Sequence, residues 1–355
     1  MTDTTPTPSD EAAADETAAT GSAGAAPGTG RIAFLGLGHM GLPMAANLVA
    51  AGHDVVGYDV VPAALDAARA AGIPTADSAL DAAAGARIVL TMFPSGAHLL
   101  RAYLGGPAES GLLAAAEPDT LFLDCSTITV EESREAADAA LAAGHRSADA
   151  PVSGGVVGAE AGTLTFMVGA EEADLPQFMP LLEVMGKKIV HCGGHGAGQA
   201  AKICNNMVLG VSMIASCEAF VLGEKLGLTH QALYDVISTA SGQCWSVTTN
   251  CPVPGPVPTS PANRDYRPGF SGALMAKDLG LALAAVRSTG VAAQLGPAAA
   301  AIYEQFAAGD GGTRDFSGII TDIRDASVDA STSTPADAPA GTTAGTPADG
   351  DRSEG

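Results

Sequence analysis

The sequence has few basic residues and few aromatic side chains. Seventeen Lys and Arg stand against 39 Asp and Glu, giving a formal net charge of −22, and aromatic residues make up 4% of the chain. A protein of that charge repels phosphate backbones and anionic lipid surfaces. We therefore expect neither nucleic acid nor a membrane as a partner.

Cysteine patterns typical of metal sites are also missing from the sequence. The six cysteines include no CxxC pair and no Cys/His group at zinc-finger spacing. Without such spacing, neither a structural metal nor a disulfide framework is indicated. The sequence predicts a protein without a metal, in a reducing compartment.

The two ends of the chain contain few large apolar side chains. Residues 1–30 lack a basic segment followed by an apolar run, so no secretory signal is indicated and the expected location is the cytoplasm. Residues 326–355 are rich in Pro, Ala, Thr and Gly. Segments of this kind cannot offset the entropy of ordering, so both tails are predicted to be disordered.

The remaining stretch, residues 31–325, is long enough for two domains. In residues 31–192 short apolar runs alternate with helical stretches, which predicts an α/β fold with a mainly parallel sheet covered on both faces. Residues 193–325 are expected to form an all-helical domain for substrate binding and oligomerisation. One short strand is predicted directly after Arg31 and a second that ends at Asp59, with further strands at 86–92, 121–125, 163–168 and 188–192. Helices are predicted at 40–51, 199–226, 229–239, 272–289 and 296–308.

Two segments of the second domain need a separate interpretation. The run 207–222 is apolar, but it is shorter than a membrane span and carries Glu218, so a buried helix is predicted. Residues 244–268 contain many prolines, which a helix interior does not tolerate. A long loop is predicted there, and loops of that length are usually functional.

The most informative motif is GLGHMG, which follows the first strand and opens the first helix. Gly36 allows a tight turn, Gly38 lets a diphosphate approach the backbone, and Gly41 permits close packing of helix and strand. Asp59 ends the next strand, where a carboxylate accepts hydrogen bonds from ribose hydroxyls and repels a 2′-phosphate. The sequence predicts NAD as the cofactor. The residues of this loop that are predicted to bind the cofactor are Gly36, Leu37, Gly38, His39, Met40 and Gly41.

Three further stretches carry polar groups in patterns suited to a site. In DAPVSGG, Ser153 precedes Gly154 and Gly155, whose open peptide N–H groups suit a substrate carboxylate, although a plain turn fits equally well. Lys202 and Asn206 are four residues apart, so they share one face of an otherwise apolar helix. In FSGALMAKDLGLA, which begins at Phe270, Lys277 and Asp278 interrupt an apolar stripe; an exposed ion pair also fits this stretch.

These four stretches, in this order, resemble the β-hydroxyacid dehydrogenases over residues 31–325. The fold that this resemblance implies is a Rossmann-type, doubly wound, mainly parallel sheet in residues 31–192, which binds NAD, followed by an all-helical domain in residues 193–325. The resemblance implies oxidation of a short 3-hydroxy acid by NAD, with 3-hydroxyisobutyrate of valine catabolism as the first candidate and methylmalonate semialdehyde as its product. The MFPSG stretch and the loop around Trp245 favour that substrate. Tartronate semialdehyde reduction, or action on another short β-hydroxyacid, is the alternative. A nucleotide-binding module without activity is a further interpretation, disfavoured because Lys202 and Asn206 are both present.

The resemblance also implies roles for individual residues. Lys202 is the general acid/base and Asn206 orients the substrate. Phe93, Pro94, Ser126 and Thr127 lie on the nicotinamide side of the cofactor. The residues expected to contact substrate are Ser153, Gly154, Gly155, Trp245, Phe270 and Lys277, with Lys277 also near the cofactor.

The oligomeric state is inferred from the apolar, Ala-rich helices of the second domain. Small residues permit close helix approach, and packing between subunits would bury such helices. A homodimer or homotetramer is expected, and the resemblance points the same way.

Overall fold

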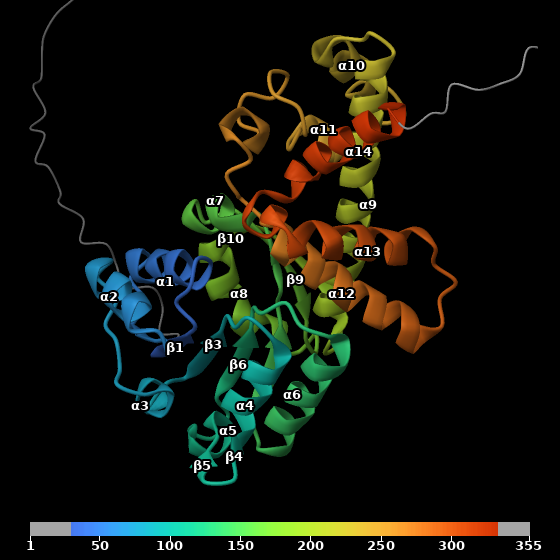
Figure 1. Cartoon of the computed structure of the whole chain (residues 1–355). Helices are drawn as coiled ribbons and strands as arrows, with labels where there is room; N and C mark the ends of the chain where they lie inside the picture. The colour runs from blue at the N-terminus through green and yellow to red at the C-terminus, as the bar shows by residue number, and fades with distance from the viewer. Residues whose placement is uncertain (1–29, 333–355) are drawn as a thin grey trace, which may run out of the picture. The chain divides into compact units, whose positions relative to one another are not determined.

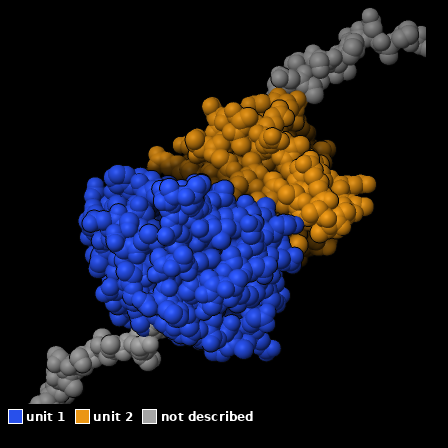
Figure 2. All heavy atoms as spheres, turned by 90° about the horizontal axis from the view of Figure 1, so that it is seen from below, with its two compact units in different colours: residues 1–200 blue, residues 201–355 orange. Residues whose placement is uncertain are grey.

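The computed structural model describes residues 30–332, which form two compact units. The first unit ends at Ala200 and the second begins at Ala201 (Figure 2). The disorder predicted for residues 1–29 and 333–355 lies outside the described residues. Helix α14, Ile320–Thr332, continues beyond residue 326, where the sequence analysis expects the ordered part to end.

Unit 1 is built on one mainly parallel sheet, in the order β10-β9-β7-β6-β3-β1-β2, with β8 paired to β9 (Figure 1). Within this sheet of the described residues, only the pairs β7 with β9 and β8 with β9 are antiparallel. The first strand pairs with β2 on one side and β3 on the other, so the direction of winding reverses there. In such sheets ligands bind outside the carboxyl ends of the strands at this point. The strands of the sheet are β1 Ile32–Leu35, β2 Val55–Tyr58, β3 Ile88–Thr91, β6 Leu121–Asp124, β7 Arg146–Asp149, β8 Val152–Ser153, β9 Leu164–Gly169 and β10 Gly186–Gly193.

Alternate residues of the central strands enter two separate apolar cores, one on each face of the sheet. Ile32 and Phe34 of β1 lie in the core covered by α1, α2, α7 and α8, whereas Ala33 and Leu35 lie in the core covered by α3 to α6. The sheet is therefore buried on both faces, as the sequence predicts. The helices are α1 Gly41–Ala50, α2 Pro62–Ala70, α3 Ala79–Ala83, α4 Gly96–Leu104, α5 Leu112–Ala115, α6 Val130–Ala142, α7 Gly155–Glu160 and α8 Leu175–Met185; β4 Gly105–Gly106 and β5 Glu109–Ser110 form a small hairpin.

Every regular element of unit 2 among the described residues is helical. Its core gathers large side chains such as Phe220, Met275 and Tyr303 from three different helices. The helices are α9 Ala197–Lys225, which starts within unit 1, α10 His230–Ile237, α11 Trp245–Thr248, α12 Gly272–Thr289, α13 Leu295–Ala308 and α14, with short 3-10 turns at Pro261–Arg264, Asp310–Thr313 and Phe316–Ile319.

The proline-rich segment of residues 244–268 is a folded part of unit 2. Cys251 and Val253 are completely buried in the core, and the Tyr266 hydroxyl donates a 2.9 Å hydrogen bond to the carbonyl oxygen of Pro252. These contacts secure the segment although it contains little regular structure. Helix α9 is long and apolar enough to cross a membrane, but half of its most apolar stretch is buried inside the fold. That burial fits the core helix predicted from the sequence.

Candidate active site

The glycine loop joins β1 to α1, and two of its glycines are required by packing. Gly36 has φ +94°, and a Cβ on it would overlap the carbonyl oxygen of Met92. A Cβ on Gly41 would overlap the carbonyl oxygen of Gly36, which shows how closely helix and strand approach. These are the steric roles that the sequence assigns to the two residues.

Gly38 differs from its neighbours because its backbone faces open space. A Cβ built on Gly38 meets no atom within 4 Å. The helix that follows has no side-chain cap and no acidic residue in its first turn. An uncapped helix N-terminus beside an open glycine backbone suits a diphosphate, so this loop fits the dinucleotide that the motif predicts. Leu37 is buried under the loop, His39 is exposed, and Met40 packs against the core.

Asp59 lies directly after β2 and holds the glycine loop in place. Its two carboxylate oxygens accept hydrogen bonds from the backbone N–H of Leu37 at 2.7 Å and of Val61 at 2.8 Å. The carboxylate is half-buried and lies beside the loop. This placement suits a ribose with free hydroxyls better than one that carries a phosphate.

The segments after β3 and β6 are joined by side-chain hydrogen bonds. The backbone N–H of Phe93 donates to Ser126 Oγ at 2.7 Å, and Ser126 Oγ donates to Asp124 Oδ1 at 2.6 Å. The structure thus brings together two segments that the sequence analysis places near the nicotinamide, Phe93–Pro94 and Ser126–Thr127. Asp124 is a site residue that the sequence motifs do not indicate, since its only local signal is an acidic residue at the end of an apolar strand.

Ser153 and the two glycines after it lie where β8 meets α7. Gly154 and Gly155 have φ values of 138° and 62°, which residues other than glycine rarely adopt. Ser153 is half-buried and Gly154 is exposed. The turn therefore requires glycine and leaves backbone accessible to a ligand.

Asp149, at the start of the same motif, caps helix α9. Its carboxylate accepts hydrogen bonds from the backbone N–H of Gly196 at 2.6 Å and of Gln199 at 2.8 Å. Burial raises the pKa of Asp149, and these two backbone bonds oppose the rise. The Gln199 side chain donates to the carbonyl oxygen of Ser126 at 2.7 Å. The sequence analysis did not assign either role, because the partners are about 50 to 70 residues apart in the chain.

Unit 2 contains a buried cluster of polar side chains from α9 and α12. Lys202 is 7% exposed, Asn206 2% and Asp278 5%. The side-chain amide of Asn206 donates a hydrogen bond of 2.5 Å to Asp278 Oδ2. Burial lowers the pKa of Lys202, the Lys277 ammonium lowers it further, and the Asp278 carboxylate opposes both. Burial raises the pKa of Asp278, and the two lysines and the Asn206 bond oppose that rise. Lys202 is thus an amine whose protonated form is disfavoured.

The other two predicted residues of unit 2 are placed differently. Trp245 opens α11 and is 51% exposed. Phe270 is half-buried, and its ring packs edge-on against Phe316 with centroids 5.7 Å apart. Phe270 is anchored to the core of unit 2, whereas Trp245 presents an apolar ring to the surroundings.

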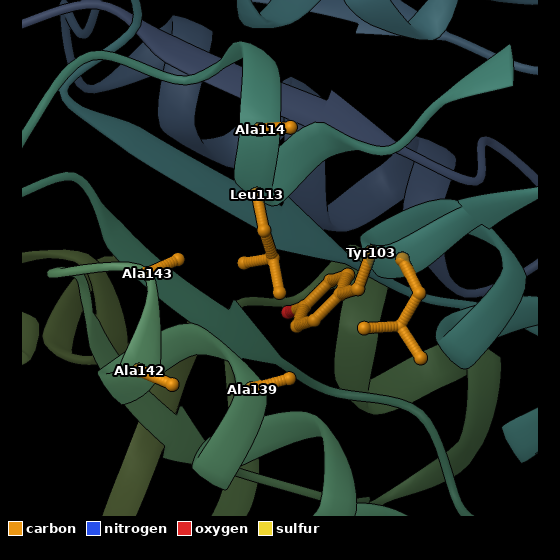
Figure 3. Close-up of a pocket in the computed structure, with 7 residues that line it drawn as sticks. Tyr103, Leu113, Ala114, Ala139, Ala142 and Ala143 are labelled. Carbon is orange, nitrogen blue, oxygen red and sulfur yellow. The ribbon is translucent and has the colours of Figure 1, made fainter.

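A hollow of about 420 Å³ lies elsewhere, among α4, α5 and α6 (Figure 3). Tyr103, two leucines and four alanines line it, and none of them is a predicted site residue. The hollow therefore holds none of the residues predicted to act in catalysis or in cofactor binding. Within residues 30–332 no cluster of three or more His, Cys, Asp or Glu could hold a metal ion.

Together, the sheet, the glycine loop and the carboxylate after β2 define a dinucleotide-binding oxidoreductase of the Rossmann type. Residues 31–194 match the family described as the NAD binding domain of 6-phosphogluconate dehydrogenase. Residues 196–323 match the family described as the NAD-binding domain of NADP-dependent 3-hydroxyisobutyrate dehydrogenase.

Individual proteins that resemble this chain show which kind of dinucleotide-binding oxidoreductase it is. A probable 3-hydroxyisobutyrate dehydrogenase of Mycobacterium tuberculosis is 57% identical, covering 82% of this chain and 97% of the relative. The solved structure of Mycobacterium tuberculosis 3-hydroxyisobutyrate dehydrogenase with L-serine has a TM-score of 0.79 and covers 83% of this chain and 99% of that one. An NAD-dependent L-serine dehydrogenase of Pseudomonas aeruginosa is 45% identical, covering 81% of this chain and 95% of the relative. The chain belongs to the β-hydroxyacid dehydrogenase family and is an oxidoreductase with an NAD(P) cofactor.

Proposed function

We propose that the protein oxidises 3-hydroxyisobutyrate to methylmalonate semialdehyde with NAD, in valine catabolism. The observation that carries the proposal is the buried amine of Lys202, whose pKa is lowered and which lies one helical turn from Asn206. Relatives named for this activity support the choice of substrate. Residues 31–192 would hold the cofactor, and residues 193–325 would supply the acid/base and the subunit contacts.

The cofactor site follows from the glycine loop of unit 1. The open backbone of Gly38 would receive the diphosphate, and Asp59 the ribose hydroxyls. Phe93, Pro94, Ser126 and Thr127 would contact the nicotinamide end. Bound NAD supplies the acceptor for the hydride that leaves the carbinol carbon of the substrate. The Asp59 charge makes NAD, rather than NADP, the expected cofactor.

Lys202 would act as the general base and take the hydroxyl proton of the substrate onto Nζ. A free lysine amine has a pKa of about 10.4 and is mostly protonated at neutral pH. Burial and the neighbouring Lys277 ammonium both favour the neutral amine that this step requires. Positioned acid/base catalysis of this kind contributes about 10²- to 10⁴-fold.

The substrate would be oriented at both of its ends. Ser153 and the N–H groups of Gly154 and Gly155 would bind its carboxylate. The Asn206 amide has two N–H groups; one binds Asp278, and the other would donate to the reacting oxygen. Trp245 and Phe270 would form an apolar wall against the methyl group, with Lys277 at the same end of the site.

L-Serine is a second candidate substrate, because it is also a short 3-hydroxy acid. One relative is named an NAD-dependent L-serine dehydrogenase, and one similar solved structure is named together with L-serine. Serine replaces the methyl group with a charged amine. An apolar wall disfavours that charge, so we place 3-hydroxyisobutyrate first.

The deciding experiment follows the absorbance of the reduced nicotinamide with 3-hydroxyisobutyrate, L-serine, glycerate and 6-phosphogluconate, each with NAD and with NADP. We expect the highest kcat/KM with 3-hydroxyisobutyrate and NAD, at least about tenfold above L-serine, because an apolar wall disfavours the charged amine of serine. A higher kcat/KM for L-serine would reverse the assignment. No turnover with any 3-hydroxy acid would reject it.

We further propose that the protein is a cytoplasmic homodimer or homotetramer. Large apolar side chains of unit 2 are exposed in the single chain, among them Val208, Leu222 and Leu295, each at least 60%. Subunit contacts would bury such side chains. Light scattering of the purified protein should give a mass of two or four chains, and a mass of one chain would contradict this proposal.

A further inference from the structure

Asp124, at the carboxyl end of β6, is a buried carboxylate of which only one oxygen has hydrogen-bond partners in the described structure. It is 4% exposed. Its Oδ1 accepts three hydrogen bonds: from Thr91 Oγ1 at 2.7 Å, Ser126 Oγ at 2.6 Å and the Ser126 backbone N–H at 3.2 Å. Its Oδ2 is buried and has no hydrogen-bond partner in the described structure. One oxygen therefore organises three donors while the other remains unsatisfied.

This arrangement lowers the stability of the folded state. Burial raises the pKa of Asp124 to about 6, the Asp149 carboxylate adds to the rise, and the bonds from Ser126 and Thr91 oppose it. The titratable groups around it are acidic or neutral: the Tyr103 hydroxyl from α4, the Cys125 thiol and the Asp149 carboxylate. A buried charge without a cation weakens a fold, so stability alone does not explain the residue.

Asp124 controls the direction of one hydroxyl. A serine hydroxyl has one proton and rotates freely. Because Ser126 Oγ donates that proton to Asp124, a lone pair remains to accept the Phe93 N–H at 2.7 Å. The carboxylate thereby links the segment after β6 to the segment after β3. On its other side Ser126 is held by Gln199, which donates to its carbonyl oxygen.

We propose that Asp124 is a positioning residue for the cofactor site, which holds Phe93–Pro94 and Ser126–Thr127 in the arrangement that receives the nicotinamide end of NAD(H). The inference rests on the proposed function insofar as these segments face the nicotinamide. It does not depend on which hydroxy acid is oxidised. Asp124 acts through Ser126 and is not itself a catalytic residue.

The test compares Asp124→Asn with wild-type protein by fluorescence titration with NADH and by urea unfolding, both at pH 8. Asn keeps an oxygen at Oδ1 but removes the charge, and charge-assisted hydrogen bonds are about twice as strong as neutral ones. We expect NADH to bind about five- to tenfold more weakly. The midpoint of unfolding should equal or exceed that of wild type, because the buried charge is gone. A structural role would instead lower stability and affinity together.

Three further variants make the test specific. Ser126→Ala removes the link to Phe93, so it should weaken NADH binding by a similar factor, and the double variant should bind no worse than Ser126→Ala alone. Ser126→Ala also carries the test if Asp124→Asn does not fold. Asp315→Asn is the matched control: this buried carboxylate of unit 2 binds Ser317 and Asn250. Its NADH affinity should stay within about twofold of wild type.

The pH dependence gives an independent readout. Below pH 6 wild-type Asp124 becomes neutral, so the difference in NADH affinity between wild type and Asp124→Asn should shrink between pH 8 and pH 5.5. Wild-type affinity in Asp124→Asn at pH 8, or an equal loss in Asp315→Asn, overturns the proposal. Because NADH binding needs no substrate, a protein that binds NADH as expected but oxidises no hydroxy acid would refute the proposed function and leave this inference standing.

Discussion

The side-chain amide of Asn206 donates a hydrogen bond to the carboxylate of Asp278, although the two residues are 72 positions apart in the chain. Both are buried, and the Asp278 carboxylate also interacts electrostatically with Lys202. One carboxylate thus orients the amide and stabilises the protonated form of the amine. Lys202 and Asn206, for which we propose the acid/base and orienting roles, thus share a single supporting carboxylate.

Asp278→Asn should change both functions of this carboxylate. Loss of the negative charge lowers the pKa of Lys202 further, so the rise of kcat/KM for alcohol oxidation should move to lower pH. At its optimum kcat should fall by about tenfold, because a hydrogen bond to a charged group contributes about 1.5 to 3 kcal/mol. The pH profile of NADH formation measures both effects.

Asp235→Asn is the control for this prediction, since Asp235 is exposed on α10 and accepts a side-chain hydrogen bond from Gln231 of the same helix. Its pH profile should match that of wild type. A profile of Asp278→Asn that moves to higher pH would contradict the assigned sign.

Lys202→Met should remove catalysis while preserving the fold. Burial lowers the pKa of Lys202, so the folded chain binds this proton less tightly than the unfolded chain, and the ammonium costs stability below the folded pKa. A methionine of similar length removes that cost. We expect kcat to fall by about 10²- to 10⁴-fold, with an unchanged or higher melting temperature and unchanged NADH affinity.

Steady-state rates, thermal unfolding and NADH titration check this prediction. Lys188→Met provides a control, because Lys188 lies exposed on β10. Near-normal turnover of Lys202→Met would show that another group accepts the proton.

Local sequence signals predict the regular elements well where capping and periodicity agree. The helix predicted at 272–289 is α12 with the same bounds, because the Ser271 hydroxyl accepts the N–H of Leu274 and Gly290 ends the helix with φ +70°. The strand predicted at 121–125 is β6, apart from its last residue. Such signals act within a few residues and are readable without the fold.

Elements that depend on partners far away in the sequence were not predicted. Strand β7 consists of Arg146, Ser147, Ala148 and Asp149, a polar sequence without strand periodicity, yet it is paired with β6 and largely buried. The supporting side chains of the site, Asp124, Gln199 and Asp278, find their partners through tertiary contacts. The motif residues are readable from the sequence, but the contacts by which Asp124, Gln199 and Asp278 hold them are visible only in the fold.

Replacing Asp59 should relax the choice of cofactor. Asp59→Ser removes the charge that opposes a 2′-phosphate, and unfavourable pairing of like charges costs several kcal/mol. We expect the ratio of kcat/KM for NAD over NADP to fall by about 10- to 100-fold. Affinity for NAD should also fall, because Asp59 accepts the N–H of Leu37 in the glycine loop.

Asp54→Ser is the matched control, since Asp54 precedes β2 and pairs with Arg31 at the surface. Its cofactor ratio should not change. If Asp59→Ser kept the wild-type ratio, the charge of residue 59 would not select the cofactor.

Gly38→Ala separates binding from folding in the glycine loop. A methyl group at Gly38 meets no protein atom within 4 Å, so the free energy of unfolding should stay within about 0.5 kcal/mol of wild type. The methyl group would occupy the space assigned to the diphosphate, and NADH should bind at least about tenfold more weakly. Gly41→Ala should behave oppositely and unfold the domain, because its methyl group would overlap the carbonyl oxygen of Gly36.

The control for this last comparison is Gly280→Ala in the middle of α12, where a methyl group also meets nothing within 4 Å. Alanine is favoured over glycine in a helix by about 1 kcal/mol, so this variant should gain stability and keep its NADH affinity. NADH titration and urea unfolding of Gly38→Ala, Gly41→Ala and Gly280→Ala measure the NADH affinity and the free energy of unfolding of each variant. Wild-type NADH affinity in Gly38→Ala would mean that the diphosphate does not cross this backbone, because no other change in the loop accompanies the added methyl group.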